Sequence, residues 1–148
     1  MGVFAKAQHQ VVLADLDEKL LTEKAAQLQA QGYQADYCVL DVTNPAQIAD
    51  CAARFPADIL VNNAGIYVPK LMMETDAALF ERHMRINQLG CFLGMKAVVP
   101  AMERAGGGSI VNISSTAGLR GLVCDARCGP RFRAACRSSI ERGLVRYS

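Results

Sequence analysis

Asp58-Ile59-Leu60-Val61-Asn62-Asn63-Ala64-Gly65 and, further along, Ser109-Ile110-Val111-Asn112-Ile113-Ser114-Ser115-Thr116-Ala117-Gly118 each run from an apolar segment into small polar residues. The apolar segments are short, continuous and rich in β-branched residues, which is typical of parallel strands covered on both faces. Small residues after a strand allow a ligand to approach the backbone closely. Because ligands of open α/β sheets bind beyond the carboxyl ends of the strands, both stretches predict parts of a ligand site.

Strand-like and helix-like segments alternate along the chain. We expect strands at 10–15, 35–40, 59–61 and 109–113, and helices at 17–31, from 45 onward, and from 75 or 76 to about 104. Asp17 is suited to begin the first helix and Gly32 to end it. The inner face of that helix is expected to carry Leu20, Leu21, Ala25 and Leu28. Strands that alternate with helices predict βαβ units and a parallel sheet.

The composition is that of a soluble, globular protein. The 148 residues are 51% hydrophobic and 20% charged, and they contain no apolar run long enough to cross a membrane. The first ten residues do not form a signal peptide, so we expect a cytoplasmic protein whose six cysteines are thiols. The spacing of the cysteines and of His9 and His83 does not fit a metal site, and the two histidines are expected at the surface.

The composition changes near Leu122. Residues 123–148 contain six Arg, no Lys, three Cys, and only Asp125 and Glu141 as acids. We therefore divide the chain into a partial dinucleotide-binding domain, 1–122, and an Arg/Cys-rich tail, 123–148. Residues 139–145 are interpreted as a helical turn or two. A shifted reading frame explains such a tail, whereas an Arg-rich phosphate-binding segment is the alternative; no motif for nucleic acid is present.

Residues 4–122 resemble the short-chain dehydrogenase/reductase family. The resemblance rests on Asp15 after its strand, Asp41-Val42 after the next, Asn62-Asn63-Ala64-Gly65, Arg85-Ile86-Asn87-Gln88-Leu89-Gly90, and Ile113-Ser114-Ser115-Thr116-Ala117-Gly118. It implies a three-layer, doubly wound parallel sheet of the Rossmann type. It also implies NAD-dependent interconversion of a secondary alcohol and a ketone. The partners implied are a small-molecule alcohol or ketone, with no nucleic acid and no membrane, and a homo-oligomer is left open.

Two aspartates are expected on the adenosine side of the cofactor. A carboxylate at Asp15 would bind the ribose diol and repel a 2′-phosphate, which favours NAD over NADP. In relatives, an Asp at the position of Asp41 binds the adenine amino group, and the apolar neighbour, here Val42, lies against the ring. The alternative for both aspartates is a turn-capping role, and at Asp41 this role does not exclude ligand binding.

The remaining site residues are assigned by the resemblance. Asn63, Ala64, Gly65 and Ile113 are expected to contact the cofactor. Asn87 matches the residue that breaks the long helix and holds a water in the proton relay. Ser115 matches the serine that orients the substrate oxygen by hydrogen bonding.

Two parts of the family pattern are absent from this sequence. The general base of the family is a Tyr whose pKa is lowered by a Lys four residues later. None of Tyr33, Tyr37, Tyr67 and Tyr147 has such a Lys, and there is no G-x-x-x-G-x-G turn. We therefore expect an incomplete fold that lacks the first strand and its Gly-rich loop, and an inactive fragment. The alternatives are an intact enzyme whose sequence is misread at both ends, and a non-catalytic nucleotide-binding or dimerisation module.

Overall fold

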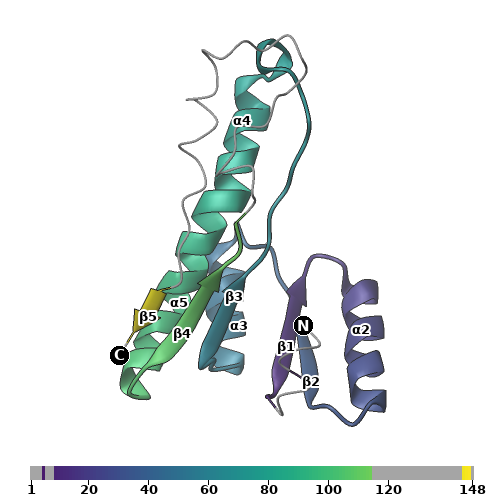
Figure 1. Cartoon of the computed structure of the whole chain (residues 1–148), viewed down its shortest axis with the longest axis vertical. Helices are drawn as coiled ribbons and strands as arrows, with labels where there is room; N and C mark the ends of the chain where they lie inside the picture. Colours follow the sequence, from purple (N-terminus) through teal and green to yellow (C-terminus); the bar gives the residue numbers. More distant parts are fainter. Residues whose placement is uncertain (1–4, 6–8, 115–144, 148) are drawn as a thin grey trace. The chain divides into compact units, whose positions relative to one another are not determined.

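The computed structural model describes Ala5, residues 9–114 and residues 145–147 (Figure 1). The chain divides into two compact units, Met1–Pro56 and Ala57–Ser148, and each has its own sheet. Among the described residues, no helix is both long enough and apolar enough to cross a membrane.

In the first unit, β1 (Val11–Asp15) and β2 (Ala35–Val39) pair in parallel and are connected by α2 (Glu18–Ala30). Asp17 caps α2 by accepting the Leu20 N–H at 3.0 Å. Gly32 follows the helix with φ of 83°, a left-handed conformation that glycine adopts without strain. The helix packs on the sheet around a core of Ala5, Val11, Leu13, Leu21 and Ala25.

The expected inner face of α2 needs one correction. Leu21 and Ala25 are buried and Leu28 packs against them, but Leu20 is 43% exposed. Successive helical residues are rotated by about 100°, so Leu20 lies on the flank of the helix when Leu21 points into the core.

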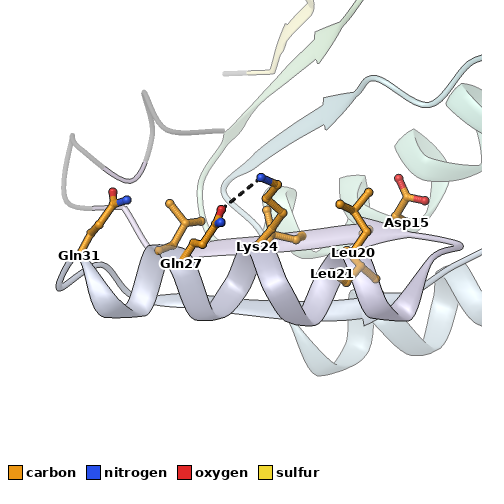
Figure 2. A pocket seen from close by; sticks show the side chains of 9 residues that line it. Asp15, Leu20, Leu21, Lys24, Gln27 and Gln31 are labelled. Carbon is orange, nitrogen blue, oxygen red and sulfur yellow. Dashed lines mark hydrogen bonds between the residues drawn. The ribbon is translucent and has the colours of Figure 1, made fainter.

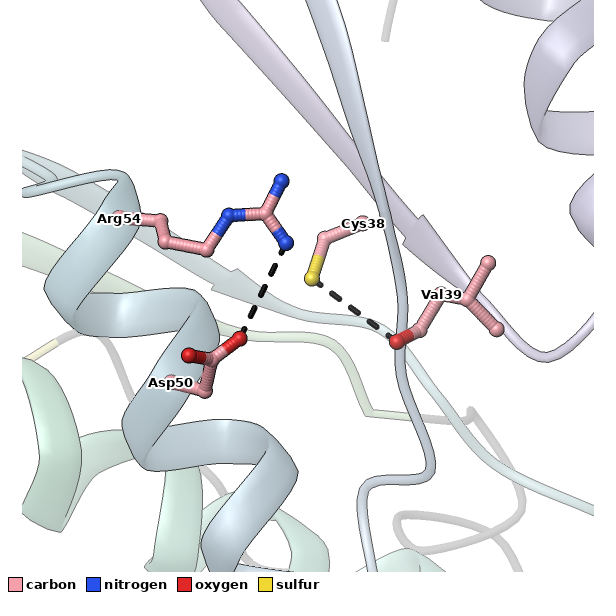
Figure 3. A network of polar contacts seen from close by, with 4 residues as sticks. All are labelled: Cys38, Val39, Asp50 and Arg54. Atoms are coloured by element: carbon pink, nitrogen blue, oxygen red, sulfur yellow. Dashed lines mark hydrogen bonds and ion pairs between the residues drawn. The ribbon is translucent and has the colours of Figure 1, made fainter.

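Helix α3 (Pro45–Arg54) follows β2 and begins at the cap residue Asn44. Side chains alternate along a strand, so Cys38 points away from the α2 core that its neighbour Tyr37 contacts. Figure 3 shows Cys38 on its strand beside α3, and its thiol donates to the carbonyl of Val39 at 3.8 Å. This unit therefore combines parallel strands with helices, which is part of the α/β fold that the sequence predicts.

In the second unit, β3 (Ile59–Asn62) and β4 (Gly108–Asn112) pair in parallel. The single turn η1 (Met72–Glu74) precedes a long helical run formed by α4 (Ala77–Met84), the π-helix η2 (Arg85–Leu89) and α5 (Gly90–Arg104), which is coloured teal in Figure 1. The expected break near Asn87 is thus confirmed. Helix α5 packs against both strands, where Met102 and Ile110 are almost completely buried.

The sheet arrangement differs from the sequence expectation in one respect. Strand β4 also pairs with β5 (Val145–Tyr147), and this pairing is antiparallel. Val145 was expected within a helical turn at 139–145; the other residues of that turn lie outside the described residues. The unpaired backbone groups along the edge of a strand favour such an addition, whichever direction the added segment runs.

Candidate functional site

Asp15 is the last residue of β1 and lies opposite Val39 of β2. Its Oδ1 atom accepts the N–H of Leu16 at 2.7 Å and that of Asp17 at 3.2 Å. The side chain is exposed, and its Oδ2 atom makes no hydrogen bond within the described residues. The turn-capping role is therefore confirmed, and it uses only one of the two carboxylate oxygens.

Asp41 lies two residues after β2, at the same edge of the sheet. Its Oδ1 atom accepts both the backbone N–H and the hydroxyl of Thr43 at 2.8 Å. Its own N–H donates to Oε1 of Gln47, also at 2.8 Å. Together with Val42, which is half-buried, Asp41 therefore belongs to a turn whose backbone is fixed by side chains on both sides.

A cavity of about 300 Å³ lies between α2 and β1 (Figure 2). Leucine side chains make up much of its wall, and Asp15, Lys24, Gln27 and Gln31 contribute polar groups. Lys24 Nζ donates to Gln27 Oε1 at 3.1 Å. Asp15, the expected ribose ligand, lines this cavity, whereas Asp41 and Val42 do not, so the cavity includes only part of the expected adenosine site.

In the second unit, the residues after β3 and β4 are accessible at the carboxyl ends of the strands. Asn63, Ala64 and Gly65 are exposed, as are Ile113 and Ser114. The N–H of Ile113 donates to the carbonyl of Asn62 at 2.9 Å, which extends the β3–β4 pairing by one bond. Ser115 lies outside the described residues.

Asn87, in the π-helix, holds the turn after β3 by two hydrogen bonds. Its Oδ1 accepts the N–H of Ile66 at 2.8 Å, and its Nδ2 donates to the carbonyl of Ile66 at 3.0 Å. A Cβ atom at Gly65 would lie 3.3 Å from Oδ1 of Asn87, so a glycine fits this close approach. Cys91 Sγ donates to the carbonyl of Asn87 at 3.5 Å. The side chain of Asn87 is thus a structural clamp on the turn that follows Gly65.

A second polar contact joins the two strands to α5, and sequence reasoning did not identify it. Asn62 Nδ2 donates to Oδ1 of Asn112 at 2.8 Å and approaches the carbonyl of Cys91 at 3.5 Å. A Cβ atom at Gly94 would lie only 2.7 Å from Asn62 Oδ1. The available signal was a glycine inside an apolar helix, because such a glycine often permits close packing.

His83 is more involved in the fold than expected of a surface residue. It is half-buried, its Nδ1 lies 2.8 Å from the carbonyl of Leu79, and its Nε2 accepts the N–H of Val68 at 3.3 Å. These contacts require the tautomer with the proton on Nδ1. Within the part of the chain that the structure describes, no three His, Cys, Asp or Glu side chains gather as a metal site would require.

Comparison with known proteins assigns the family. The family model described as short chain dehydrogenase matches residues 2–126. The chain belongs to the short-chain dehydrogenase family. It is 43% identical to trans-4-hydroxycyclohexanecarboxylate dehydrogenase of Sinomonas cyclohexanicum over 123 residues, which cover 76% of this chain and 47% of that protein. It is 32% identical to 2,5-dichloro-2,5-cyclohexadiene-1,4-diol dehydrogenase LinX of Sphingobium indicum over 153 aligned positions, which cover 95% of this chain and 61% of that one.

Solved structures of short-chain dehydrogenases have the same fold. The gluconate 5-dehydrogenase of Burkholderia cenocepacia, determined in complex with NADP and tartrate, matches with a TM-score of 0.76 and 31% identity. The match covers 91% of this chain and 53% of that one. The chain thus has a partial Rossmann-like α/β fold, and it spans about half to three-fifths of the length of these relatives.

Proposed function

We propose that this chain is the nucleotide-binding part of an NAD-dependent short-chain dehydrogenase acting on a secondary alcohol or ketone, and that the 148 residues alone do not catalyse the reaction. The observation that carries the binding proposal is the position of Asp15. It ends a parallel strand, is exposed, and keeps one carboxylate oxygen without a hydrogen bond within the described residues. Two ribose hydroxyls can donate to such a carboxylate.

The fit to the cofactor is confined to its adenosine side. Asp15 would bind the ribose, and Asp41 and Val42 would contact the adenine from the turn after β2. NAD, when bound, supplies the hydride acceptor, and no residue described here replaces it. This sequence contains no Gly-rich turn that could bind the pyrophosphate of NAD. We therefore expect a dissociation constant for NAD in the millimolar rather than the micromolar range.

Preference for NAD follows from electrostatics. A 2′-phosphate carries negative charge and would replace one of the hydroxyls that donate to Asp15. The NADP in the gluconate 5-dehydrogenase complex belongs to that protein and leaves the preference of this chain to be measured.

The test compares 5′-AMP with adenosine 2′,5′-bisphosphate by ligand-observed NMR on the full chain. We expect saturation transfer to 5′-AMP and a weaker signal for the bisphosphate. Asp15→Asn should lower the AMP signal and reduce the difference between the two ligands. Asp36→Asn is the matched control, because Asp36 is a carboxylate on β2 that pairs with Val12, away from the carboxyl edge. Equal binding of both nucleotides by the native chain would overturn the NAD preference.

Inactivity is tested separately. None of the four tyrosines has a lysine four residues later, and a missing general acid/base typically costs about 10²–10⁴ in rate. We expect no NADH formation from trans-4-hydroxycyclohexanecarboxylate, cyclic alcohols or sugar acids at millimolar NAD. Turnover that is abolished by Asp15→Ala would overturn this part of the proposal.

A dimerisation module is the second candidate. The long helical run carries three large apolar side chains that are at least 40% exposed: Phe80, Leu89 and Phe92. A second copy of the chain would cover them and remove apolar surface from water. Sedimentation equilibrium of the native chain and of Phe92→Glu tests this, and a monomer that is unaffected by the substitution excludes it.

A further inference from the structure

The cavity between α2 and β1 has an apolar floor and an acidic end (Figure 2). Leu13 of β1 and Leu21 of α2 are only 5% and 4% exposed, and they form the floor together with the partly buried Leu28. Asp15 lies at one end, and its Oδ2 atom makes no hydrogen bond within the described residues. All four residues belong to the first compact unit, so the cavity is formed within that unit alone.

The cationic side chain of the cavity is held away from this acidic end. Lys24 Nζ donates to Oε1 of Gln27, further along α2, at 3.1 Å. Figure 2 shows Leu20 between Asp15 and Lys24, with Gln27 on the far side of Lys24. Asp15 forms no ion pair with a described residue. A ligand can therefore approach an unpaired carboxylate along an apolar wall.

The dimensions of the cavity define the size of such a ligand. Its volume is about 300 Å³, which is about twice that of an apolar cavity that holds benzene. A helix rises about 1.5 Å per residue, so Leu20 and Gln27 are about 10 Å apart along α2. A phenyl ring on a short alkyl chain, with about ten to twelve non-hydrogen atoms in all, fits both dimensions.

We propose that this cavity binds a small aryl-alkyl amine, such as 4-phenylbutylamine, whose ammonium group pairs with Asp15 and whose ring lies on Leu21 and Leu28. An ammonium group donates hydrogen bonds and carries the charge that complements the open carboxylate oxygen. A hydroxyl group at the same place would donate without the charge, and a carboxylate would be repelled. The apolar body of the ligand would leave water for a leucine-lined wall, as in most small-molecule sites.

The amine site shares one residue with the proposed nucleotide site. Asp15 lines the cavity, whereas Asp41 and Val42 do not. Binding of the amine does not depend on the proposed function. Competition with a nucleotide does rest on it, because the ribose diol and the ammonium group would use the same carboxylate. We therefore expect 5′-AMP to weaken the binding of the amine.

Methyl NMR of the full chain, with labelled leucine, tests the proposal. The ligands 4-phenylbutylamine, 4-phenylbutan-1-ol and 4-phenylbutyrate differ only in the polar end and are titrated at pH 7. We expect the amine to bind about two- to fivefold more tightly than the alcohol, as for an exposed ion pair, and the acid to bind most weakly. Methyl shifts should change at Leu13, Leu21 and Leu28. Leu60 of β3, in the other unit, is the internal reference and should not respond.

Four variants separate the charge of the site from its apolar wall. Asp15→Asn should remove the advantage of the amine over the alcohol, whereas Asp36→Asn removes a carboxylate that does not line the cavity and should preserve it. Leu20→Ala should weaken both ligands by about threefold or more. Leu20 is 43% exposed, so the core does not depend on it. Leu16→Ala is its control, because Leu16 is 68% exposed and does not line the cavity.

Several results would overturn the proposal. These are tightest binding of the acid, equal binding of the amine and the alcohol, an advantage of the amine that survives Asp15→Asn, shifts that include Leu60, and no binding at all. If the amine binds as expected and 5′-AMP binds without displacing it, only the shared use of Asp15 is refuted. If 5′-AMP does not bind, the proposed nucleotide site fails and the amine site stands.

Discussion

Replacing Gly94 with alanine tests how closely α5 packs on β3. The new Cβ atom would lie 2.7 Å from Oδ1 of Asn62, which is closer than real Cβ contacts occur. The amide cannot move freely, because Nδ2 of Asn62 donates to Asn112 at 2.8 Å. Helix α5 must therefore shift outward, or the Asn62–Asn112 hydrogen bond must break.

The expected cost combines three terms. Overpacking of a tight contact costs about 1–3 kcal/mol. Loss of the amide–amide hydrogen bond adds about 1 kcal/mol. The higher helix propensity of alanine offsets this cost by about 1 kcal/mol. We expect Gly94→Ala to lower the free energy of unfolding of the second unit by about 1–3 kcal/mol.

Hydrogen exchange of the α5 amides measures this free energy without interference from the first unit. Lys96→Ala changes an exposed position two residues away and should shift it by less than about 0.5 kcal/mol. Asn62→Ala removes the clashing atom, so the double variant with Gly94→Ala should cost less than the two single variants together. A Gly94→Ala chain that is more stable than the native chain, or fully additive effects, would refute the packing argument.

Three further outcomes follow from individual contacts. Asp76 accepts the Leu79 N–H at 2.7 Å, so Asp76→Ala should lower the free energy of unfolding in urea by about 1 kcal/mol. Asp76→Asn keeps an oxygen acceptor for this cap and should retain most of that free energy. Asn87→Ala should lower the free energy of unfolding by about 1–3 kcal/mol and speed amide exchange at Ile66. Arg85→Ala, which changes an exposed side chain on the same π-helix, should have neither effect. Burial raises the pKa of Cys51 to about 12, so its alkylation rate should rise about tenfold from pH 9 to pH 10. A thiol with a pKa near 9 would react only about twice as fast at the higher pH. A twofold rise for Cys51 would therefore contradict the raised pKa.

The helices and strands could be predicted because their signals are local. Asp17, Asn44 and Asp76 each cap the helix that the sequence predicts after them, and Gly32 has the positive φ expected after a helix. Apolar alternation and helical periodicity act over a few residues, so they are readable from the chain alone.

Contacts between distant residues could not be predicted in the same way. Asn87 was expected at a helix break, but its partner Ile66 is 21 residues away and is identified only by the folded backbone. The pairing of Asn62 with Asn112 spans 50 residues. The antiparallel addition of β5 to β4 is also non-local, and no periodicity in the tail indicated it.

The family motifs of this chain have structural roles that do not require catalysis. Asp15 and Asp41 fix turns after β1 and β2, and Asn87 clamps the backbone after Gly65. Each contact would stabilise the fold whether or not a cofactor binds, so the presence of these residues supports family membership without establishing activity. Evidence for activity must therefore come from residues that catalysis needs and the fold does not, above all a tyrosine with a lysine four residues later. Because that pair is missing from the sequence, nucleotide binding and turnover are separate questions for this chain, and only binding has a candidate residue with an open oxygen, Asp15.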